Sequence, residues 1–357
     1  MIAGSIAPMP SVSSFGATFD VAPGYLNTAS CGVPPRHVVE VVHRWVDDWG
    51  RAGVDAVAMD EPVDASRAAF AQLTGVPTST VAVGSAVSGL LGPVAASFPA
   101  ATRVLTAAGE FTSVSWPFAA CGHAVDEVPV GEIPARAAEY DVVAVSVAQS
   151  ADGALVDLEA LRAATAGGDT VVVLDGTQSI GWLPADLGWA DAVVAGGYKW
   201  LLAPRGAAWL ACSERLLARV VPSAAGWYAG DDRWARAYGL PLALADEARR
   251  LDVSPAWSSF VGAAASLGWL AGLDPAAVHD HGVGLAARVR EALDLPPCPS
   301  PIVSIPGPDA GGRLAAAGIA GAPRAGATRV AFHLHNTDED VDLLLGALRA
   351  RGHFRRS

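Results

Sequence analysis

The amino-acid sequence predicts an α/β fold, with a mostly parallel central sheet in a large domain and a smaller α+β domain after it. Short runs of apolar residues alternate with helical stretches over the first two thirds of the chain. These runs are apolar throughout rather than at every second position, as in strands that helices cover on both faces. The pattern changes from about Leu240, and 357 residues correspond to about two domains. We therefore place the large domain at residues 1–239 and the small domain at residues 240–357.

The elements of the large domain follow from these apolar runs. Parallel strands joined by right-handed helical crossovers bind ligands beyond the carboxyl ends of the strands, so residues that follow a strand are candidates for a site. The predicted helices are Asp157–Thr165 and Ser213–Val221. The predicted strands are Arg103–Ala107, Val142–Val147, Thr170–Leu174, Asp191–Ala195 and Ala207–Ala211.

The small domain combines helices with two further strands. A helix is expected after Ser254–Trp257, and three acidic residues after Asn336 favour another, because acids stabilise the first turn of a helix. The Ala/Gly-rich segment Leu314–Ala327 predicts a mobile loop near the end of a helix. The other predicted elements are a helix at Val283–Leu293 and strands at Ile302–Ile305 and Arg329–His335.

Composition excludes several classes of function. The formal net charge is −12, which disfavours nucleic acid or an anionic membrane as a partner, because both attract clustered cations. Only 17% of the residues are charged, against roughly 25% in an average domain, so a disordered chain is not expected. The uncharged stretches Ala68–Thr102 and Ala256–Leu273 are interrupted by prolines or flanked by aspartates, and we expect buried helices there rather than membrane spans.

The cysteines and the first residues predict a cytoplasmic protein. A secretory signal has a basic segment before its apolar stretch, and the first basic residue is Arg36. No Cys-x-x-Cys pair occurs, a spacing that suits neither a disulfide framework nor a zinc site. The four cysteines are Cys31, Cys121, Cys212 and Cys298.

The chain has a single lysine. Of its 24 basic residues, 23 are arginine and one is Lys199. A primary amine can lose its proton and attack a carbonyl, whereas a guanidinium stays protonated because its pKa lies above about 12. A compositional bias toward arginine therefore leaves Lys199 as the candidate for Schiff-base chemistry.

A carboxylate and this amine follow neighbouring predicted strands. Asp175 comes at the end of one apolar run, with Gln178 three residues later, and Lys199 comes shortly after the next. Trp200 follows the lysine, so the Gly-Lys-Ser/Thr of a phosphate loop is missing, and no GxGxxG or GxSxG occurs. Pyridoxal phosphate chemistry needs such a pair, because a lysine forms the internal aldimine and an acid keeps the pyridine nitrogen protonated.

From Tyr25 to about Asp342 the chain resembles the class V, fold type I pyridoxal-phosphate enzymes, which include cysteine desulfurases, C–S lyases, kynureninase and related aminotransferases. The most specific part is Asp175-x-x-Gln178 followed by Tyr198-Lys199-Trp200. The resemblance implies a cofactor-binding large domain whose N-terminal segment borders the pocket. It also implies a homodimer in which the two subunits share each site.

The same resemblance implies which residues bind the cofactor. Val83-Gly84-Ser85-Ala86 matches the turn that opens a helix and cradles the phosphate, and free amides at a helix N-terminus bind anions. Glu110-Phe111-Thr112 matches the segment whose aromatic ring stacks on the pyridine ring. The complete set of implied catalytic and cofactor-binding residues is Ser85, Ala86, Phe111, Gln149, Asp175, Gln178, Tyr198 and Lys199.

The substrate residues that the resemblance implies are Asn27 and Arg329. Asn27 lies in a segment that borders the pocket of the family, and Arg329 precedes a C-terminal segment in which an arginine grips the substrate carboxylate. Arginine suits planar, bidentate capture of a carboxylate. Because the chain is negative overall, an anionic substrate needs such a local cation.

Several of these residues have a structural alternative. Without its motif Phe111 would be taken for a core residue, and a lone arginine such as Arg329 is usually a surface residue of a strand, but its place after a flexible loop favours the functional role. Cys31 lies near the expected pocket, and we expect a buried, inert thiol. His333 and His335 have no third ligand nearby in sequence, so we expect a structural role and predict no metal site.

Departures from the family pattern narrow the reaction. Family desulfurases carry a cysteine in the loop before the arginine, and Ala317–Thr328 has none. They also usually stack a histidine where this chain has Phe111, so cysteine desulfuration is disfavoured. Gly196 replaces the hydroxyl or imidazole residue that often contacts the phosphate, and Ser254–Trp257 replaces the usual Gly-Thr-Pro. For the phosphate contact that Gly196 cannot make, we expect backbone amides at Ser85 and Ala86, or the neighbouring subunit, to substitute.

The sequence therefore predicts an enzyme that acts on an α-amino acid through a Lys199 aldimine and a Cα carbanion. That carbanion leads either to β-elimination, as in C–S lyases, or to transamination, and the sequence does not distinguish the two. The second hypothesis is a catalytically silent homologue that serves as a binding or scaffold subunit. The intact Asp175, Gln178 and Lys199 favour the enzyme.

Overall fold

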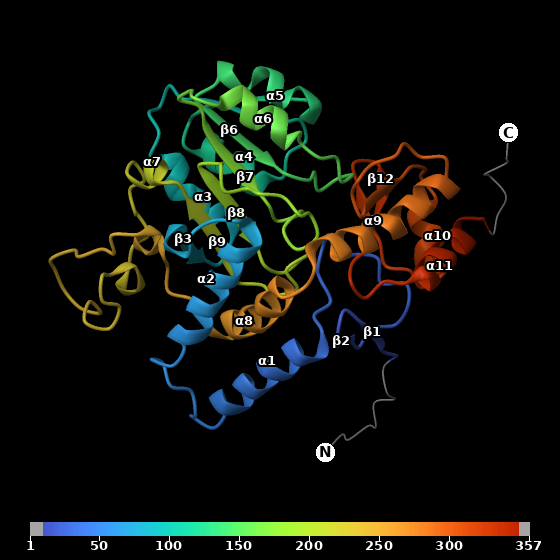
Figure 1. Ribbon diagram of the computed structural model, residues 1–357, viewed down its shortest axis with the longest axis horizontal. Coiled ribbons are helices and arrows are strands. Elements are labelled where there is room, and N and C mark those ends of the chain that lie inside the picture. The colour runs from blue at the N-terminus through green and yellow to red at the C-terminus, as the bar shows by residue number, and fades with distance from the viewer. Residues whose placement is uncertain (1–9, 350–357) are drawn as a thin grey trace.

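A seven-stranded sheet forms the centre of the computed structural model, which describes residues 10–349 (Figure 1). Neighbouring strands from β8 to β5 run parallel, whereas β9 is antiparallel to both β8 and β3. The predicted mostly parallel sheet is confirmed. In spatial order the strands are β3 (Val81–Gly84), β9 (Ala208–Cys212), β8 (Ala192–Gly196), β7 (Val171–Asp175), β6 (Val142–Ser146), β4 (Arg103–Ala107) and β5 (Ala124–Val128).

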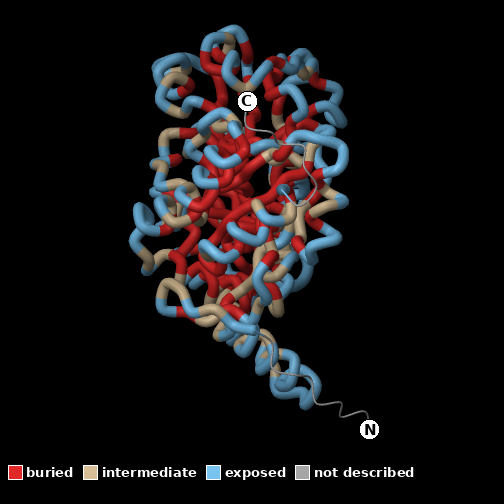
Figure 2. The backbone as a smooth tube through the Cα atoms, turned by 90° about the vertical axis from the view of Figure 1, so that its right-hand side faces the viewer, coloured by how far each residue is buried: buried red, intermediate tan, exposed pale blue. Residues whose placement is uncertain are grey.

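Helices cover both faces of this sheet, which explains why its central strands are apolar throughout. Val171 and Val173 share a hydrophobic cluster with α3 (Val87–Ala96), α4 (Thr112–Ala120) and α7 (Glu214–Leu217). Val172 and Leu174 pack on the other side with α2 (Asp60–Thr74), α5 (Ile133–Arg136), α6 (Leu158–Thr165) and α8 (Trp257–Ala271). Every residue of β6, β7, β8 and β9 is buried, and Figure 2 shows the buried residues concentrated in the middle of the molecule.

A second, antiparallel sheet lies beside the large one, at the right of Figure 1. Its order is β10 (Ile302–Ile305), β12 (Ala327–Ala331) and β11 (Ala322–Arg324). Apolar residues of α9 (Pro275–Ala292), α10 (Ala310–Ala316) and α11 (Asp338–Arg349) form one cluster with it. The N-terminal hairpin of β1 (Val12–Ser14) and β2 (Ala17–Phe19) precedes a segment whose Leu26 joins this cluster.

The connection between the two sheets runs through α8. This helix packs against α2 and against α1 (Arg36–Trp49), on the side of the large sheet, although it follows residue 240 in sequence. The domain boundary at residues 239 and 240 therefore stays a prediction. Among the described residues no single helix is long and apolar enough to cross a membrane, and only α8 and α9 taken together pass that test, with a bend of 94° between them.

Some elements begin or end elsewhere than the sequence predicts. The helix expected from Val283 begins eight residues earlier, because Asp274 caps it by accepting the Ala276 N–H and Pro275 suits a first turn. The strand expected to reach His335 stops at Ala331, since Asn336 Oδ1 accepts the His333 N–H and closes a turn. The expected loop Leu314–Ala327 contains the end of α10 and the whole of β11.

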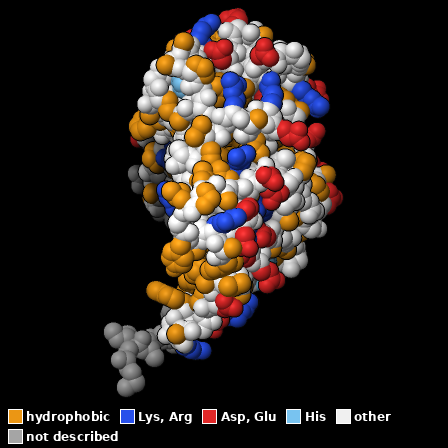
Figure 3. Space-filling view, turned by 90° about the vertical axis from the view of Figure 1, so that its left-hand side faces the viewer, with side chains coloured by type: hydrophobic (Ala, Val, Ile, Leu, Met, Phe, Trp, Pro, Cys, Tyr) orange, Lys and Arg blue, Asp and Glu red, His pale blue; other side chains and the backbone are white. Residues whose placement is uncertain are grey.

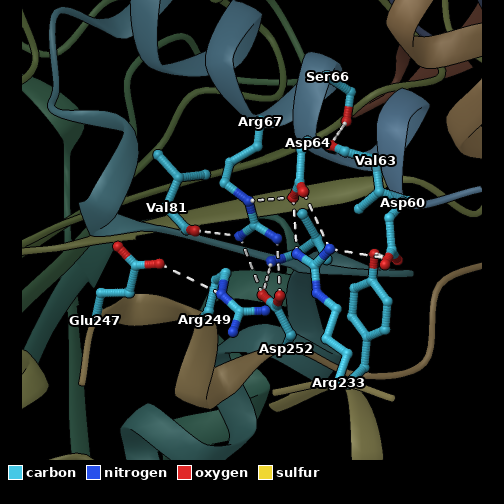
Figure 4. A network of polar contacts seen from close by, with 12 residues as sticks. Asp60, Val63, Asp64, Ser66, Arg67, Val81, Arg233, Glu247, Arg249 and Asp252 are labelled. Carbon is cyan, nitrogen blue, oxygen red and sulfur yellow. Dashed lines mark hydrogen bonds and ion pairs between the residues drawn. The ribbon is translucent and has the colours of Figure 1, made fainter. Parts of the chain in front are cut away.

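A buried network of charges fixes the start of the large sheet (Figure 4). The Asp252 carboxylate accepts hydrogen bonds from the Arg67 guanidinium and from the Val83 N–H, each at 2.8 Å. Arg233 reaches the same cluster and pairs with Asp64 at 2.8 Å. The network thereby joins α2, β3 and the segment that precedes α8. Loss of one partner of such a buried pair would leave an uncompensated charge, and the bond from the Val83 N–H ties β3 to this network.

Candidate active site

A cavity of about 250 Å³ lies at the carboxyl ends of the parallel strands. Its lining includes seven serine and threonine side chains and one tyrosine. It also includes two cationic side chains and one carboxylate. The lining comes from chain segments that follow β3, β4, β6, β7 and β8 and from the segment that precedes β9. The lining residues are Ser85, Ala86, Val87, Ser88, Phe111, Thr112, Ser113, Ser146, Ser150, Asp175, Thr177, Gln178, Gly196, Tyr198, Lys199 and Arg205.

Strand order and register bring Asp175 and Lys199 into this cavity. Asp175 is the last residue of β7, and Lys199 comes three residues after the end of β8, the next strand of the sheet. Asp175 pairs with Val194 in the parallel ladder, so the two chains leave the sheet at the same edge. The predicted juxtaposition of amine and carboxylate at one sheet edge is what the structure shows.

Lys199 is a buried amine whose surroundings favour its neutral form. Only 5% of the residue is exposed, and its Nζ lies 5.0 Å from the centroid of the Phe111 ring and 5.6 Å from that of Tyr198. Burial lowers the pKa of Lys199 to about 8, against a smaller opposite effect of Asp175. Within residues 10–349 no hydrogen bond to this Nζ occurs, so the amine is available to a ligand.

Asp175 is a buried carboxylate with an unusually high proton affinity. Burial raises its pKa to about 6, although the N–H of Thr177 donates to Oδ1 at 2.8 Å. Thr177 in turn accepts the Gly196 N–H at its Oγ1, 3.0 Å away, which ties the ends of β7 and β8 together. The carboxylate therefore has a fixed position and a tendency to share a proton.

Two helices begin at the cavity wall. Ser85 and Ala86 lie between β3 and the first residue of α3, and Phe111 directly precedes α4. Free N–H groups at helix starts favour an anion. Glu110 fixes the second helix start, because its carboxylate accepts the N–H groups of Phe111 and Ser146, each at 2.8 Å. Phe111 is 41% exposed, so its ring lines the cavity rather than the core.

The side chains of the two predicted glutamines form hydrogen bonds with other groups of the protein. Gln178 lines the cavity, and its side chain donates to Ala29 O and Ser150 Oγ and accepts the Trp200 Nε1–H. Gln149 donates instead to Glu110 Oε2 at 3.1 Å and is not among the lining residues. The structure therefore places Gln149 beside Glu110, outside the lining of this cavity, and its role toward the cofactor stays a prediction.

Arg329 and Asn27 lie next to the cavity without lining it. The Arg329 guanidinium donates to Ser150 O at 2.6 Å and to Ser30 Oγ at 2.7 Å, and the residue is 1% exposed. Burial, together with the charge of Arg324, lowers the pKa of Arg329 to about 10. In the described part of the chain it has no carboxylate partner. Asn27 pairs with Ala331 through its backbone, and its buried Oδ1 has no hydrogen-bond partner there.

The structure also corrects and extends the sequence predictions. Cys31 is exposed rather than buried. His333 and His335 have the predicted structural role, since their Nε2 atoms bond to the backbone oxygens of Trp200 and Tyr25. Arg205 in the cavity lining was missed, and the signal for it was its position just before an apolar run that returns antiparallel to the same sheet edge.

These residues fit pyridoxal phosphate. The unpartnered, buried amine of Lys199 suits an aldehyde, and the carboxylate of Asp175 suits a protonated ring nitrogen. The helix start at Ser85 and Ala86 suits a phosphate, and the exposed ring of Phe111 suits a planar heterocycle.

Comparisons with known proteins agree with a pyridoxal-phosphate enzyme of this family type. The family model described as aminotransferase class-V matches residues 128–304. An uncharacterized aminotransferase of Bacillus subtilis, YcbU, is 26% identical over 325 residues, which cover 82% of this chain and 84% of that protein. The resemblance to class V enzymes is thereby confirmed, and with it pyridoxal phosphate as the cofactor.

Solved structures share the fold. The cysteine desulfurase CsdA of Escherichia coli has a TM-score of 0.78 at 20% identity, with 92% of this chain and 94% of that chain covered. The cystine C–S lyase C-DES, solved with its product cysteine persulfide, has a TM-score of 0.80 at 19% identity, with 92% and 97% covered. A C-DES mutant with glycine covalently linked to its pyridoxal phosphate has a TM-score of 0.82 at 18% identity, with 93% and 97% covered. The fold type I architecture is confirmed.

The raised pKa of Asp175 predicts a pH-dependent effect of Asp175→Asn on the cofactor-free protein. Because the pKa is about 6 in the folded protein and 3.8 ordinarily, the contribution of this group to stability is present below pH 3.8 and is lost as pH rises through 6. At pH 7.5 the variant should therefore be more stable than wild type by roughly 1–3 kcal/mol, and the gain should vanish toward pH 4.

Urea unfolding of both proteins at several pH values measures this difference. The exposed Asp169→Asn is the matched control and should show no pH-dependent gain. A difference between Asp175→Asn and wild type that is the same at pH 4 and pH 7.5 would contradict the prediction.

Proposed function

We propose that this chain, a pyridoxal-phosphate-dependent enzyme that resembles the class V aminotransferases, acts on an α-amino acid by removing the proton from its Cα atom. The observation that carries the proposal is that the Lys199 amine and the Asp175 carboxylate line one cavity at the end of neighbouring strands. When bound, the cofactor supplies an aldehyde for an amine and a ring that accepts electrons.

Lys199 is the residue that moves the proton. A base works best when its pKa lies near the working pH, and burial brings the pKa of Lys199 to about 8. Near pH 8 a large fraction of the side chain is therefore neutral at Nζ and can accept a proton. Asp175, whose pKa is about 6, is mostly ionised near pH 8, and its carboxylate would hold a protonated ring nitrogen of the bound cofactor.

Arg329 supplies the charge that makes a carboxylate substrate favourable. Burying a guanidinium without a carboxylate partner costs free energy of folding. The buried Arg329 has no such partner among residues 10–349. Its bonds to Ser30 and Ser150 hold it in place without neutralising it, and Ser150 lines the cavity. A substrate carboxylate would compensate this charge, and the substrate class we propose is therefore an α-amino acid.

Two outcomes of Cα proton removal remain in the proposal. β-Elimination is supported by the likeness to a cystine C–S lyase, and transamination by the relative described as an aminotransferase. Desulfuration through a loop cysteine has less support, because the segment from Ala317 to Thr328 contains no cysteine. A catalytically silent binding subunit is the alternative if no amino acid is turned over.

A homodimer is part of the proposal. Exposed large apolar residues gather on the end of α1, on the loop between α1 and α2, and on the segment between β9 and α8, at the left of Figure 1. Figure 3 views that side and shows apolar side chains over its lower half. Such surfaces are typical of protein interfaces. The residues include Val46, Trp49, Val57, Trp234, Tyr238, Leu240 and Leu242.

A product assay tests the proposed reaction. The wild-type protein, loaded with cofactor, should convert an amino acid or a cysteine conjugate into a 2-oxo acid. Release of an equal amount of ammonia identifies elimination. A 2-oxo acid formed without ammonia identifies transamination, in which the amino group passes to the cofactor and then to a second 2-oxo acid that is supplied as acceptor. Lys199→Ala should lower kcat by at least about 100-fold, because it removes the general base.

Lys199→Arg is the matched control, since it keeps the positive charge but cannot lose its proton, and it should be as inactive as Lys199→Ala. Unchanged turnover in either variant would overturn the mechanism. Cofactor binding without turnover across a broad panel of amino acids would instead favour the silent homologue.

Replacement of Arg329 tests the proposed substrate class. Arg329→Met removes the cation and keeps an apolar stem, so it should raise KM for the amino acid by about 10- to 100-fold with little change in cofactor absorbance. The resistance of the cofactor-free protein to urea should not fall, since an uncompensated buried charge is lost. The exposed Arg324→Met is the control, and an equal rise in KM for both variants would sink the assignment.

A further inference from the structure

Arg205 is a cation of the cavity that the proposed function does not use. It lines the same cavity as Lys199, and the other lining residues include one carboxylate, Asp175. Between residues 10 and 349 the Arg205 guanidinium forms no ion pair. It lies over the Tyr198 ring, with its Cζ 5.0 Å from the ring centroid.

The register of β9 places Arg205 at the anion-binding end of the cavity. Ala208 pairs with Gly84 on one side and with Gly196 on the other. Arg205, three residues before Ala208, therefore enters at the edge where the chain leaves β3 toward Ser85. The helix start of α3 and the Arg205 side chain consequently flank the same part of the cavity.

Arg329 lies on the β6 side of the sheet edge that the cavity occupies, away from Arg205. Its guanidinium bonds to Ser150, which follows β6, whereas Arg205 precedes β9. Strands β7 and β8 lie between β6 and β9 in the sheet, and they carry Asp175 and lead to Lys199. The strands that lead to the amine and the carboxylate therefore lie between the two arginines.

The backbone around Arg205 is fixed. Ser259 Oγ, on α8, donates to Arg205 O at 2.9 Å. The following Gly206 has a φ of +109°, and a Cβ there would lie 2.8 Å from Ser259 Oγ, so only glycine fits. Together with the contact to the Tyr198 ring, these constraints hold the guanidinium at the cavity although the residue is exposed.

Gly196, which also lines the cavity, has no side chain that could bind an anion. Gly196 stands where class V enzymes often have a hydroxyl or imidazole group for the phosphate, and it offers no side chain. We propose that Arg205 binds the cofactor phosphate together with the N-terminal amides of α3, in place of that missing group. The proposal rests on the proposed function, since it takes pyridoxal phosphate as the ligand.

Equilibrium binding of two cofactor forms tests the proposal. The full chain, stripped of cofactor, is titrated with pyridoxal phosphate and with pyridoxal, which has the aldehyde and ring but no phosphate, and binding is followed by absorbance and tryptophan fluorescence. Arg205→Ala should weaken binding of pyridoxal phosphate by about 10- to 100-fold, as expected for a charge-assisted contact. Its affinity for pyridoxal should stay within about twofold of wild type, because only the phosphate contact is lost.

Arg324→Ala is the matched control, because Arg324 also places positive charge near Lys199 but does not line the cavity. It should leave both affinities within about twofold of wild type. Equal losses for the two ligands in Arg205→Ala, or no loss for either, would overturn the proposal. Failure of wild type to bind either ligand would instead refute the proposed function.

Discussion

The structure depends on keeping a primary amine and a carboxylate out of water at one edge of a parallel sheet. Burial disfavours the charged form of both, so the pKa of Lys199 falls to about 8 and that of Asp175 rises to about 6. Burying these two ionisable groups does not stabilise the fold. Both pKa shifts create groups that can exchange protons near neutral pH, which is what an enzyme needs from a base and from a partner for a ring nitrogen.

The rest of the fold holds this pair in place and adds charge around it. Residues of β7 and β8 pack on both sheet faces, so their ends cannot move independently. The buried Asp252 network anchors β3 and thereby the turn at Ser85. Arg205 and Arg329 lie at opposite ends of the cavity edge, and the protein therefore offers two separate cationic positions although its net charge is −12.

The site residues that directly follow a strand could be predicted from the sequence. Asp175, Lys199 and the turn at Ser85 each follow an apolar strand directly, and strand ends meet at one edge in a parallel sheet. Gln149 and Arg205 depended on facts that local patterns do not contain. The first turns toward Glu110 instead of the cavity, and the second is brought in by β9, the strand that reverses direction. The exposure of Cys31 likewise has no local signal in the sequence.

Chemical mapping of the cofactor's attachment point tests the central claim most directly. Borohydride reduction of the loaded protein locks the bond between an amine and an aldehyde, and peptide mass mapping then locates it. Because the chain contains one lysine, the reduced cofactor should be found on the peptide that holds Lys199. Attachment at the N-terminal amine, or none at saturating cofactor, would contradict the account.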